Sequence, residues 1–464
     1  MGNSTDKSQR FQNGTRAPAL TRCSLVPLTF QQELALNNGM HEGLAYVNFC
    51  FAALLRGSLD IDVLGRSISA VVQRHESLRT RIVVVDEDLR QAIDEPSEFR
   101  LGVVECSSGS DAQRLLQVFF SEQVDLAIGP LFNVRLLKLS EKEHVLTISL
   151  NQLITDAVSQ MLLFRELWSL YGDFIFKRPS SLPDVSLQYP RYARWQRKEH
   201  PRWLQEHEGY WKSKLAQATC IKLPIDSCLE NVKQFSPGFI EISFDQALST
   251  DLHDLARREG ATPAMIMLSL YAVVLGVWSE RVDLVIPFAV SGRPYSRHAG
   301  LIGFLSQYLA LGIDLTHNEV FGDLVSRVSQ EFTTSHDHLD FGIVIGNLPK
   351  LFKGAVMNWL PAGPVLATPS EWVGRDDFPT VEPFPFVGAF NDRFRLACDV
   401  ECIFRATTRS ISVSLLYRAD LFRRETMARF CGDLRLVSEQ VVSDRSIRVS
   451  SLQSLILDMR KAGN

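Results

Sequence analysis

The sequence lacks any long hydrophobic run. Although 45% of its 464 residues are apolar, the longest nearly apolar stretches, residues 46–55 and 268–278, are well short of the roughly 18 residues that cross a bilayer. It also lacks an excess of one charge, since 49 basic and 53 acidic side chains give a net charge of −4. Neither a nucleic acid nor a membrane surface is therefore expected as a partner.

Signals for secretion and for redox or nucleotide chemistry are also missing. Residues 1–22 are polar and contain no apolar signal-peptide core, so we expect a flexible tail on a cytoplasmic protein. The eight cysteines form no Cys-x-x-Cys pair, which favours reduced, buried thiols. No glycine-rich phosphate loop, Gly-x-Ser-x-Gly elbow or dinucleotide fingerprint occurs. Histidine is scarce, at ten residues, and this scarcity matters below.

The chain does contain two stretches of similar α/β pattern. We predict a tail over residues 1–22, an N-terminal lobe over 23–178, a linker with proline and serine over 179–188, and a C-terminal lobe over 189–464. The predicted strands cover residues 82–85, 132–139, 145–150, 283–289 and 410–417, and the predicted helices cover 60–73, 112–122, 251–259, 264–278 and 424–441.

A short polar turn follows the predicted strand 145–150. Asn151 and Gln152 end the strand, and either Thr155 or Asp156 is a suitable N-cap for the helix that comes next. The sequence therefore predicts a strand, a turn over residues 151–156 and a helix, with several polar side chains gathered at the turn.

Several blocks of the sequence resemble, in the same order, those of the condensation domains of nonribosomal peptide synthetases. The first, residues 74–80, matches the family's Arg-His-Glu-x-Leu-Arg-Thr segment without a mismatch. The further blocks are residues 125–131, 188–195, 210–211, 291–293, 302–304 and 417–422. The resemblance extends from about residue 27 to residue 441, and its strength lies in the order of the blocks rather than in any one of them.

The resemblance implies an α/β fold of two lobes, each similar to chloramphenicol acetyltransferase, that form a V-shaped pseudo-dimer with a central tunnel. It implies acyl or peptidyl carrier proteins, or synthetase modules, as partners. Their phosphopantetheine arms would bring a donor thioester and an acceptor amine. It implies no metal and no cofactor bound by the chain itself.

The resemblance places the family's signature, His-His-x-x-x-Asp-Gly, on the turn at residues 151–157. Here Asn151 and Gln152 stand in place of the two histidines, Asp156 keeps the aspartate, and Ala157 replaces the glycine. In the family the second histidine faces the reacting amine and thioester. We therefore nominate Gln152, Asn151 and Asp156 as an atypical catalytic centre.

Two functions remain open from the sequence. The first is a freestanding condensation-type acyltransferase that joins a carrier-bound acyl or aminoacyl thioester to an amine. The second is a catalytically inactive docking or recruitment module for carrier proteins or tailoring enzymes. Gln152 cannot transfer a proton, but its amide can orient an amine or hold an oxyanion, so we predict amide rather than ester formation.

The resemblance also implies that Asp156 pairs with an arginine, for which Arg293 and Arg79 are the candidates. A plain helix N-cap is an equally good interpretation of Asp156. We expect His75 to brace the block around residues 74–80 rather than to replace the missing base.

Other patterns carry less weight. Asn151, Asp156 and Ser159 differ by one residue from the Asp-x-x-x-x-Asp-x-x-Ser pattern of heterocyclisation relatives, although Ser159 also fits an ordinary first helical turn. Residues 336–340 (His-Asp-His-Leu-Asp) resemble a metal cluster, but histidines two residues apart diverge on a helix. Trp359 lies in a predicted strand that either lines the tunnel or packs in the core.

Overall fold

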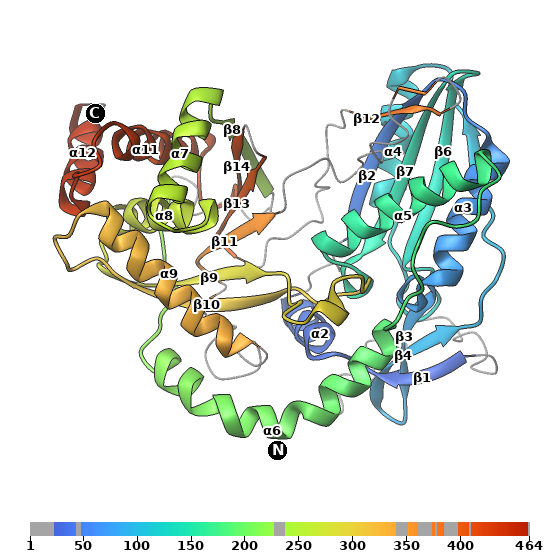
Figure 1. Cartoon of the computed structure of the whole chain (residues 1–464), viewed down its shortest axis with the longest axis horizontal. Coiled ribbons are helices and arrows are strands. Elements are labelled where there is room, and N and C mark those ends of the chain that lie inside the picture. The colour runs from blue at the N-terminus through green and yellow to red at the C-terminus, as the bar shows by residue number, and fades with distance from the viewer. Residues whose placement is uncertain are drawn as a thin grey trace. The chain divides into compact units, whose positions relative to one another are not determined.

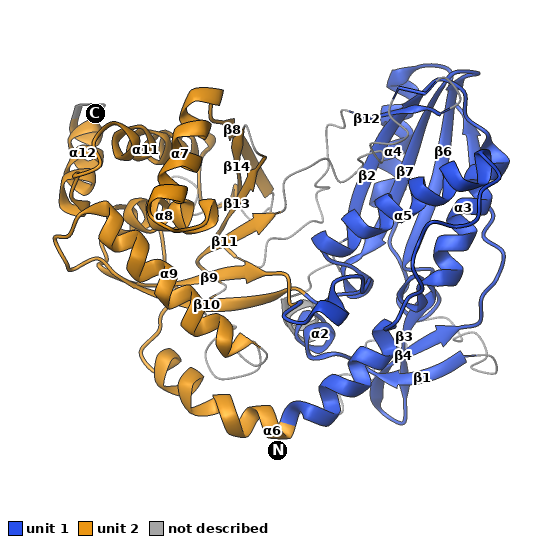
Figure 2. Cartoon of the chain, viewed as in Figure 1, with its two compact units in different colours: residues 1–200, 293–305, 363–391 blue, residues 201–292, 306–362, 392–464 orange. Residues whose placement is uncertain are grey.

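The computed structural model describes residues 23–42, 48–226, 237–339, 351, 353–360, 374–375, 378–384, 398–407 and 410–462. The chain forms two compact units, each built from three segments of the sequence (Figure 2). Unit 1 consists of Met1–His200, Arg293–Leu305 and Gly363–Asn391, and unit 2 consists of Pro201–Gly292, Ser306–Ala362 and Asp392–Asn464.

Unit 1 contains a five-stranded sheet in the order β12-β2-β7-β6-β5 and a three-stranded sheet in the order β1-β4-β3. The strands are β1 (Cys23–Pro27), β2 (Asn48–Arg56), β3 (Thr80–Val85), β4 (Asp88–Asp94), β5 (Gly102–Glu105), β6 (Phe132–Ser140), β7 (Glu143–Asn151) and β12 (Thr380–Pro383). Only the β5–β6 pair in these sheets is parallel. The helices include α2 (Phe30–Glu42), α3 (Ile61–Arg74), η2 (Glu76–Arg79), α4 (Gly109–Ser121), η3 (Gln152–Ile154), α5 (Ala157–Ile175) and η5 (Ser296–His298).

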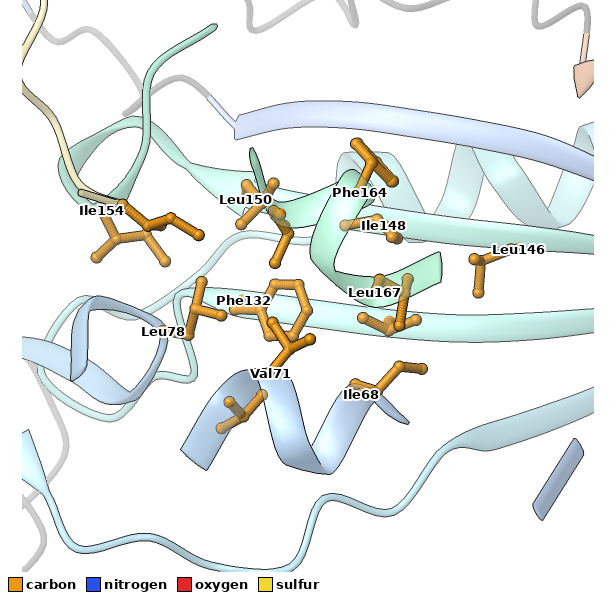
Figure 3. Packing of buried hydrophobic residues seen from close by; sticks show 14 of the residues in the cluster. Ile68, Val71, Leu78, Phe132, Leu146, Ile148, Leu150, Ile154, Phe164 and Leu167 are labelled. Atoms are coloured by element: carbon orange, nitrogen blue, oxygen red, sulfur yellow. The ribbon is translucent and has the colours of Figure 1, made fainter. Parts of the chain in front are cut away.

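Helices cover both faces of the larger sheet of unit 1. Leu146, Ile148 and Leu150 alternate along β7 and meet the apolar faces of α3 and α5 (Figure 3). Val145, one residue before Leu146, faces the other way, in a second cluster with α4 residues such as Leu116. The period of two along β7 therefore fixes which side of the sheet each helix covers, and it positions the turn that joins β7 to α5.

Unit 2 contains one six-stranded sheet in the order β10-β9-β11-β13-β14-β8 (Figure 1). The strands are β8 (Pro237–Ser243), β9 (Asp283–Val290), β10 (Gln307–Asp314), β11 (Ala355–Leu360), β13 (Val400–Ala406) and β14 (Ile411–Arg418). The helices include α7 (Gln246–Arg258), α8 (Pro263–Ser279), α9 (Phe321–Asp337), α11 (Arg424–Ser443) and α12 (Val449–Ala462). Residues 265–278 of α8 are all buried, as their nearly continuous apolar sequence predicts.

The ten helices and strands predicted from the sequence overlap observed elements and are confirmed. The predicted linker, residues 179–188, carries no helix or strand, and α6 (Tyr189–Leu215) begins directly after it. The first half of α6 belongs to unit 1, because Tyr189, Tyr192 and Gln196 are buried against residues of that unit. The two units are therefore not successive halves of the chain.

No single helix in the described part of the chain has the length and apolar composition of a membrane span. One bent pair, α7 with α8, meets that test by length and composition only, with an angle of 104° at the break. No disulfide joins the described cysteines, of which Cys106, Cys398, Cys402 and Cys431 are buried.

Candidate functional site

The turn between β7 and α5 is held by the side chain of Asn151. Its Oδ1 accepts a hydrogen bond of 3.0 Å from the backbone N–H of Leu153, and its Nδ2 donates 2.9 Å to Oδ1 of Asn48. Asn48 lies directly opposite on β2. Asn151 is 1% exposed, so both its polar atoms are satisfied inside the protein. This geometry makes Asn151 a residue that shapes the turn.

Gln152 begins the short helix η3 that follows and is half-buried. Within the described ranges, its side-chain amide forms no hydrogen bond, whereas Asn151, one residue earlier, forms two. An amide offers one acceptor oxygen and two N–H donors. Gln152 is therefore the polar group of the turn that remains available to a ligand.

The residue after Gln152 is also held in place, because the carbonyl oxygen of Leu153 accepts a hydrogen bond of 2.8 Å from Nε2 of Gln32. Gln32 lies on α2 and is completely buried, and its Oε1 accepts 3.0 Å from the backbone N–H of Thr29. The sequence indicated neither this contact nor that of Asn48, because both join residues more than 100 positions apart.

Asp156 is both the N-cap of α5 and one partner of an ion pair. Its Oδ1 accepts 2.8 Å from the backbone N–H of Ser159, as an N-cap does. Its two oxygens also accept 2.9 and 2.8 Å from the two terminal nitrogens of Arg293, and Oδ2 accepts 3.0 Å from the backbone N–H of Leu305. Asp156 is therefore both a helix N-cap and an ion-pair partner, and of the two candidate arginines it pairs with Arg293.

Arg293 ties the turn to the segment Arg293–Leu305. Besides Asp156, it donates 2.9 Å to Oγ of Ser159 and 3.0 Å to the carbonyl of Leu301. The Oγ of Ser159 in turn donates 2.8 Å to the carbonyl of Gly303 and accepts 3.0 Å from its N–H. Because both charged side chains are at most 5% exposed, this bidentate pair fixes the start of α5 against residues 301–305.

Gly303 is required by the packing of Tyr189. A Cβ at this position would lie 2.1 Å from the Tyr189 ring, so no larger residue fits without movement. The hydroxyl of Tyr189 donates 2.8 Å to the carbonyl of Phe304 and is 2.9 Å from Oγ1 of Thr29. Burial raises the pKa of Tyr189 well above its usual value, so this hydroxyl stays neutral and acts as a brace.

Arg79 and His75 lie away from Asp156. Arg79 donates to the backbone carbonyl of Asp94 and is 3.7 Å from Glu76. Nε2 of His75 is 2.7 Å from Oε2 of Glu166, which also accepts 2.9 Å from Nε of Arg74. Burial would raise the pKa of Glu166, but its bonds and charge contacts with His75 and Arg74 lower it overall. His75 is thus a brace between α3 and α5.

The remaining candidates lie in other surroundings. Ala157 is the half-buried first residue of α5. Trp359 is half-buried on β11 and pairs in register with the buried Phe404. His336 stacks on Phe332, and Nδ1 of His338 is 2.8 Å from Nδ1 of His207; residue 340 lies outside the described residues. No cluster of three metal-ligating side chains occurs in the described ranges.

Comparison with known proteins gives the family of this chain. The family model "Condensation domain" matches residues 24–461. The chain belongs to the condensation-domain family. The likeness to solved condensation-domain structures also confirms the predicted mixed α/β fold with two lobes similar to chloramphenicol acetyltransferase.

Relatives of this condensation domain include chondramide synthase from Chondromyces crocatus, 32% identical over 425 residues, and surfactin synthase subunit 1 from Bacillus subtilis, 29% identical over 427 residues. Each alignment covers 89% of this chain and 11% of the relative. The chain thus spans about a tenth of the length of these curated relatives.

Two similar solved structures cover nearly the whole condensation domain. The X-domain in a complex with OxyB from teicoplanin biosynthesis has a TM-score of 0.74 and 23% identity, covering 95% of this chain and 99% of that one. SgcC5 from Streptomyces globisporus has a TM-score of 0.74 and 22% identity, covering 91% and 100%. At such low identity these likenesses support the fold alone.

Proposed function

We propose that this condensation domain joins a carrier-bound acyl or aminoacyl thioester to an amine. The observation that carries the proposal is the turn itself: a buried Asp156–Arg293 pair holds its far end, and Gln152 keeps an unengaged, half-buried amide at its near end. The Asp156 carboxylate accepts hydrogen bonds from Ser159, Arg293 and Leu305, whereas the Gln152 amide can still bond to a ligand.

The proposed chemistry needs no group that titrates at Gln152. The lone pair of a neutral amine attacks the thioester carbonyl, the tetrahedral oxyanion forms, and the C–S bond breaks to release the thiolate of the carrier arm. The proton lost by the ammonium nitrogen goes to that thiolate through solvent. The Gln152 amide donates to the oxyanion, a contact whose removal in other enzymes lowers the rate by about 100- to 1000-fold.

The missing base sets the choice of nucleophile. A positioned acid–base group is worth about 10²–10⁴-fold in rate. An α-amine has a pKa near 8 and is partly neutral without help, whereas an alcohol depends on a base to lose its proton. Amide formation is therefore the expected reaction, and ester formation is not.

The proposal favours condensation over heterocyclisation for a geometric reason. Asn151 is occupied by Leu153 and Asn48, and the Ser159 hydroxyl is occupied by Gly303 and Arg293. Both are buried, so neither offers a free group for cyclisation chemistry.

A recruitment module is the second candidate. It is favoured by the absence of a proton-transferring side chain at Gln152, and the X-domain from teicoplanin biosynthesis, which shares the fold, was solved in a complex with OxyB. In that case the chain would bind carrier proteins or a tailoring enzyme without forming a bond.

Incubation with loaded donor and acceptor carriers, followed by intact mass measurement, tests the proposal. The proposal expects an amide product from the parent, a loss of about 100-fold in Gln152→Ala, and a full rate in Gln117→Ala, whose side chain is exposed on α4. If no carrier pair gives product above background, the recruitment module remains as the candidate function. If Gln152→Ala forms product as fast as the parent, Gln152 is not a catalytic residue.

A further inference from the structure

The two faces of the unit 2 sheet are built differently. On the face covered by α8 and α9, residues that pair in register form a row across all six strands. Every member of this row is buried: Leu309, Phe288, Met357, Cys402, Leu415 and Ile240. The ring contacts Tyr271–Phe404 and Phe288–Phe332 join this face to those helices.

The adjacent row belongs to the opposite face. Its members, again in register across the six strands, are Tyr308, Ala289, Asn358, Ile403, Ser414 and Glu241. Glu401 and Arg405 flank Ile403 on β13, two residues to either side, and therefore point to this face as well. This face therefore carries two charged groups, Glu401 and Arg405, and both are half-buried.

Glu401 is a half-buried carboxylate with too few partners. Its Oε1 accepts one hydrogen bond, 3.2 Å from Nδ2 of Asn358, and among described residues no basic group lies within 4.0 Å of it. Burial raises the pKa of Glu401, and the Asn358 bond and the charge of Arg405 oppose that rise. Its neighbours on this face include the buried Ile403 and Leu416, which offer no polar group, and Tyr308, whose pKa is raised by burial and by the charge of Glu401.

Arg405 is not the missing partner of Glu401, because the two side chains form no ion pair. Its guanidinium donates 2.8 Å to Oγ of Ser414, and no carboxylate among the described residues forms an ion pair with it. Burial lowers the pKa of Arg405, while Glu241 and Glu401 act at longer range to raise it. Two opposite charges on one sheet face, each half-buried and held apart, differ from a structural salt bridge, which brings its partners into contact.

We propose that Glu401 and Asn358 bind the ammonium group of an aminoacyl donor on this second face of the unit 2 sheet. An ammonium group has three N–H donors and no acceptor. Glu401 has an oxygen with no described partner, and Asn358, whose Nδ2 is used, has its Oδ1 available. The two acceptors and the negative charge match that group, and a neutral acyl chain would leave them unsatisfied.

This inference rests on the proposed function, in which the donor is an acyl or aminoacyl thioester and the amino group of an aminoacyl donor takes no part in the reaction. It assigns to Glu401 the selection of ligands that carry an amine, a property separate from the turn at Gln152. A divalent cation fits less well, since one carboxylate and one amide supply only part of the oxygen ligands that such ions take.

Two probes that differ only in an amino group provide the test. They are alanyl-pantetheine amide and propionyl-pantetheine amide, in which an amide nitrogen replaces the thioester sulphur and prevents hydrolysis. Their dissociation constants are measured at pH 7 by calorimetry with the parent, with Glu401→Gln and with Glu241→Gln. Glu241 is the matched control, since it is an exposed carboxylate on the same face of β8.

We expect the parent and Glu241→Gln to prefer the alanyl probe by about 10- to 100-fold, the range of a hydrogen bond to a charged group, and Glu401→Gln to bind the two probes equally. A parent that binds both probes equally, or a preference that survives in Glu401→Gln, overturns the inference. If the carrier assay yields no product but the Glu401-dependent preference is measured, only the proposed function fails. Product without that preference removes only the inference.

Discussion

Two carboxylates, one in each unit, differ in how many hydrogen-bond partners the fold gives them. Asp156 is 3% exposed and accepts hydrogen bonds from Ser159, Arg293 and Leu305. Glu401 is half-buried and, within the described residues, accepts one bond, from Asn358. A buried carboxylate whose hydrogen bonds are all made holds the surrounding residues in place. A carboxylate with too few partners lowers the stability of the fold, and we expect it to be kept where a ligand supplies the missing partners.

The largest expected effect comes from breaking the paired charge. Arg293→Ala leaves Asp156 buried without its cation, which typically costs about 3–5 kcal/mol and lowers the melting temperature by roughly 10 °C. Arg405→Ala removes a guanidinium with one described hydrogen bond and is expected to cost about 1 kcal/mol or less. Thermal unfolding followed by circular dichroism compares them, and equal losses would refute the contrast.

The next effect concerns His298, which lies in unit 1 among Tyr192, Trp195 and Tyr295 and is 1% exposed. Burial, with the charges of Arg297 and Arg293, lowers the pKa of His298 to about 4. As the pH falls below about 6.5, the unfolded chain takes up this proton and the folded chain does not, so stability falls until about pH 4, by roughly 3 kcal/mol in all.

Urea unfolding at pH 7 and pH 4.5 checks this prediction. His298→Gln should lose clearly less stability than the parent between the two pH values. The control is His317→Gln, since His317 is exposed, and it should follow the parent. An unchanged pH dependence in His298→Gln would show that His298 is not the group that titrates.

A smaller effect is expected at the hydroxyl that links the turn to residues 301–305. Ser159→Ala removes the bonds to both backbone groups of Gly303 and one from Arg293, and it should cost about 1–3 kcal/mol because the Gly303 groups stay buried. Ser140→Ala, which removes an exposed hydroxyl bonded to the N–H of Lys142, is the control and should cost less than about 0.5 kcal/mol. Chemical denaturation resolves this difference, and similar costs would count against the brace.

The smallest effect is expected at Glu401. Glu401→Gln keeps the shape of the side chain and its bond with Asn358 while it removes an underpaired charge. The free energy of unfolding should therefore stay within about 1 kcal/mol of the parent or rise slightly. A loss above about 2 kcal/mol would show that Glu401 is a structural charge and that the contrast with Asp156 is wrong.

Local pattern was sufficient to predict much of this fold. The alternation on β7 and the apolar run of α8 lie within single elements, and both were predicted correctly. The N-cap role of Asp156 also follows from a local motif. By contrast β12, a four-residue strand that pairs with β2 more than 300 positions earlier, carries no such pattern.

The candidate site shows the same limit. Asn151, Gln152 and Asp156 stand together on one turn, so their sequence spacing was enough to identify them. The choice between Arg293 and Arg79 was not, because an ion pair across 137 positions depends on tertiary structure. The neighbours Asn48 and Gln32 could not be assigned for the same reason. The underpaired state of Glu401 depends on which residues of five other strands share its face.

The pH dependence of single-turnover amide formation tests the central claim most directly. If Gln152 acts by hydrogen bonding and the amine loses its proton unaided, the rates of the parent and of Gln152→Ala should both rise with an apparent pKa near 8. The two profiles should be parallel, with the variant about 100-fold lower. Equal rates, or a profile whose shape changes when Gln152 is removed, would contradict the account.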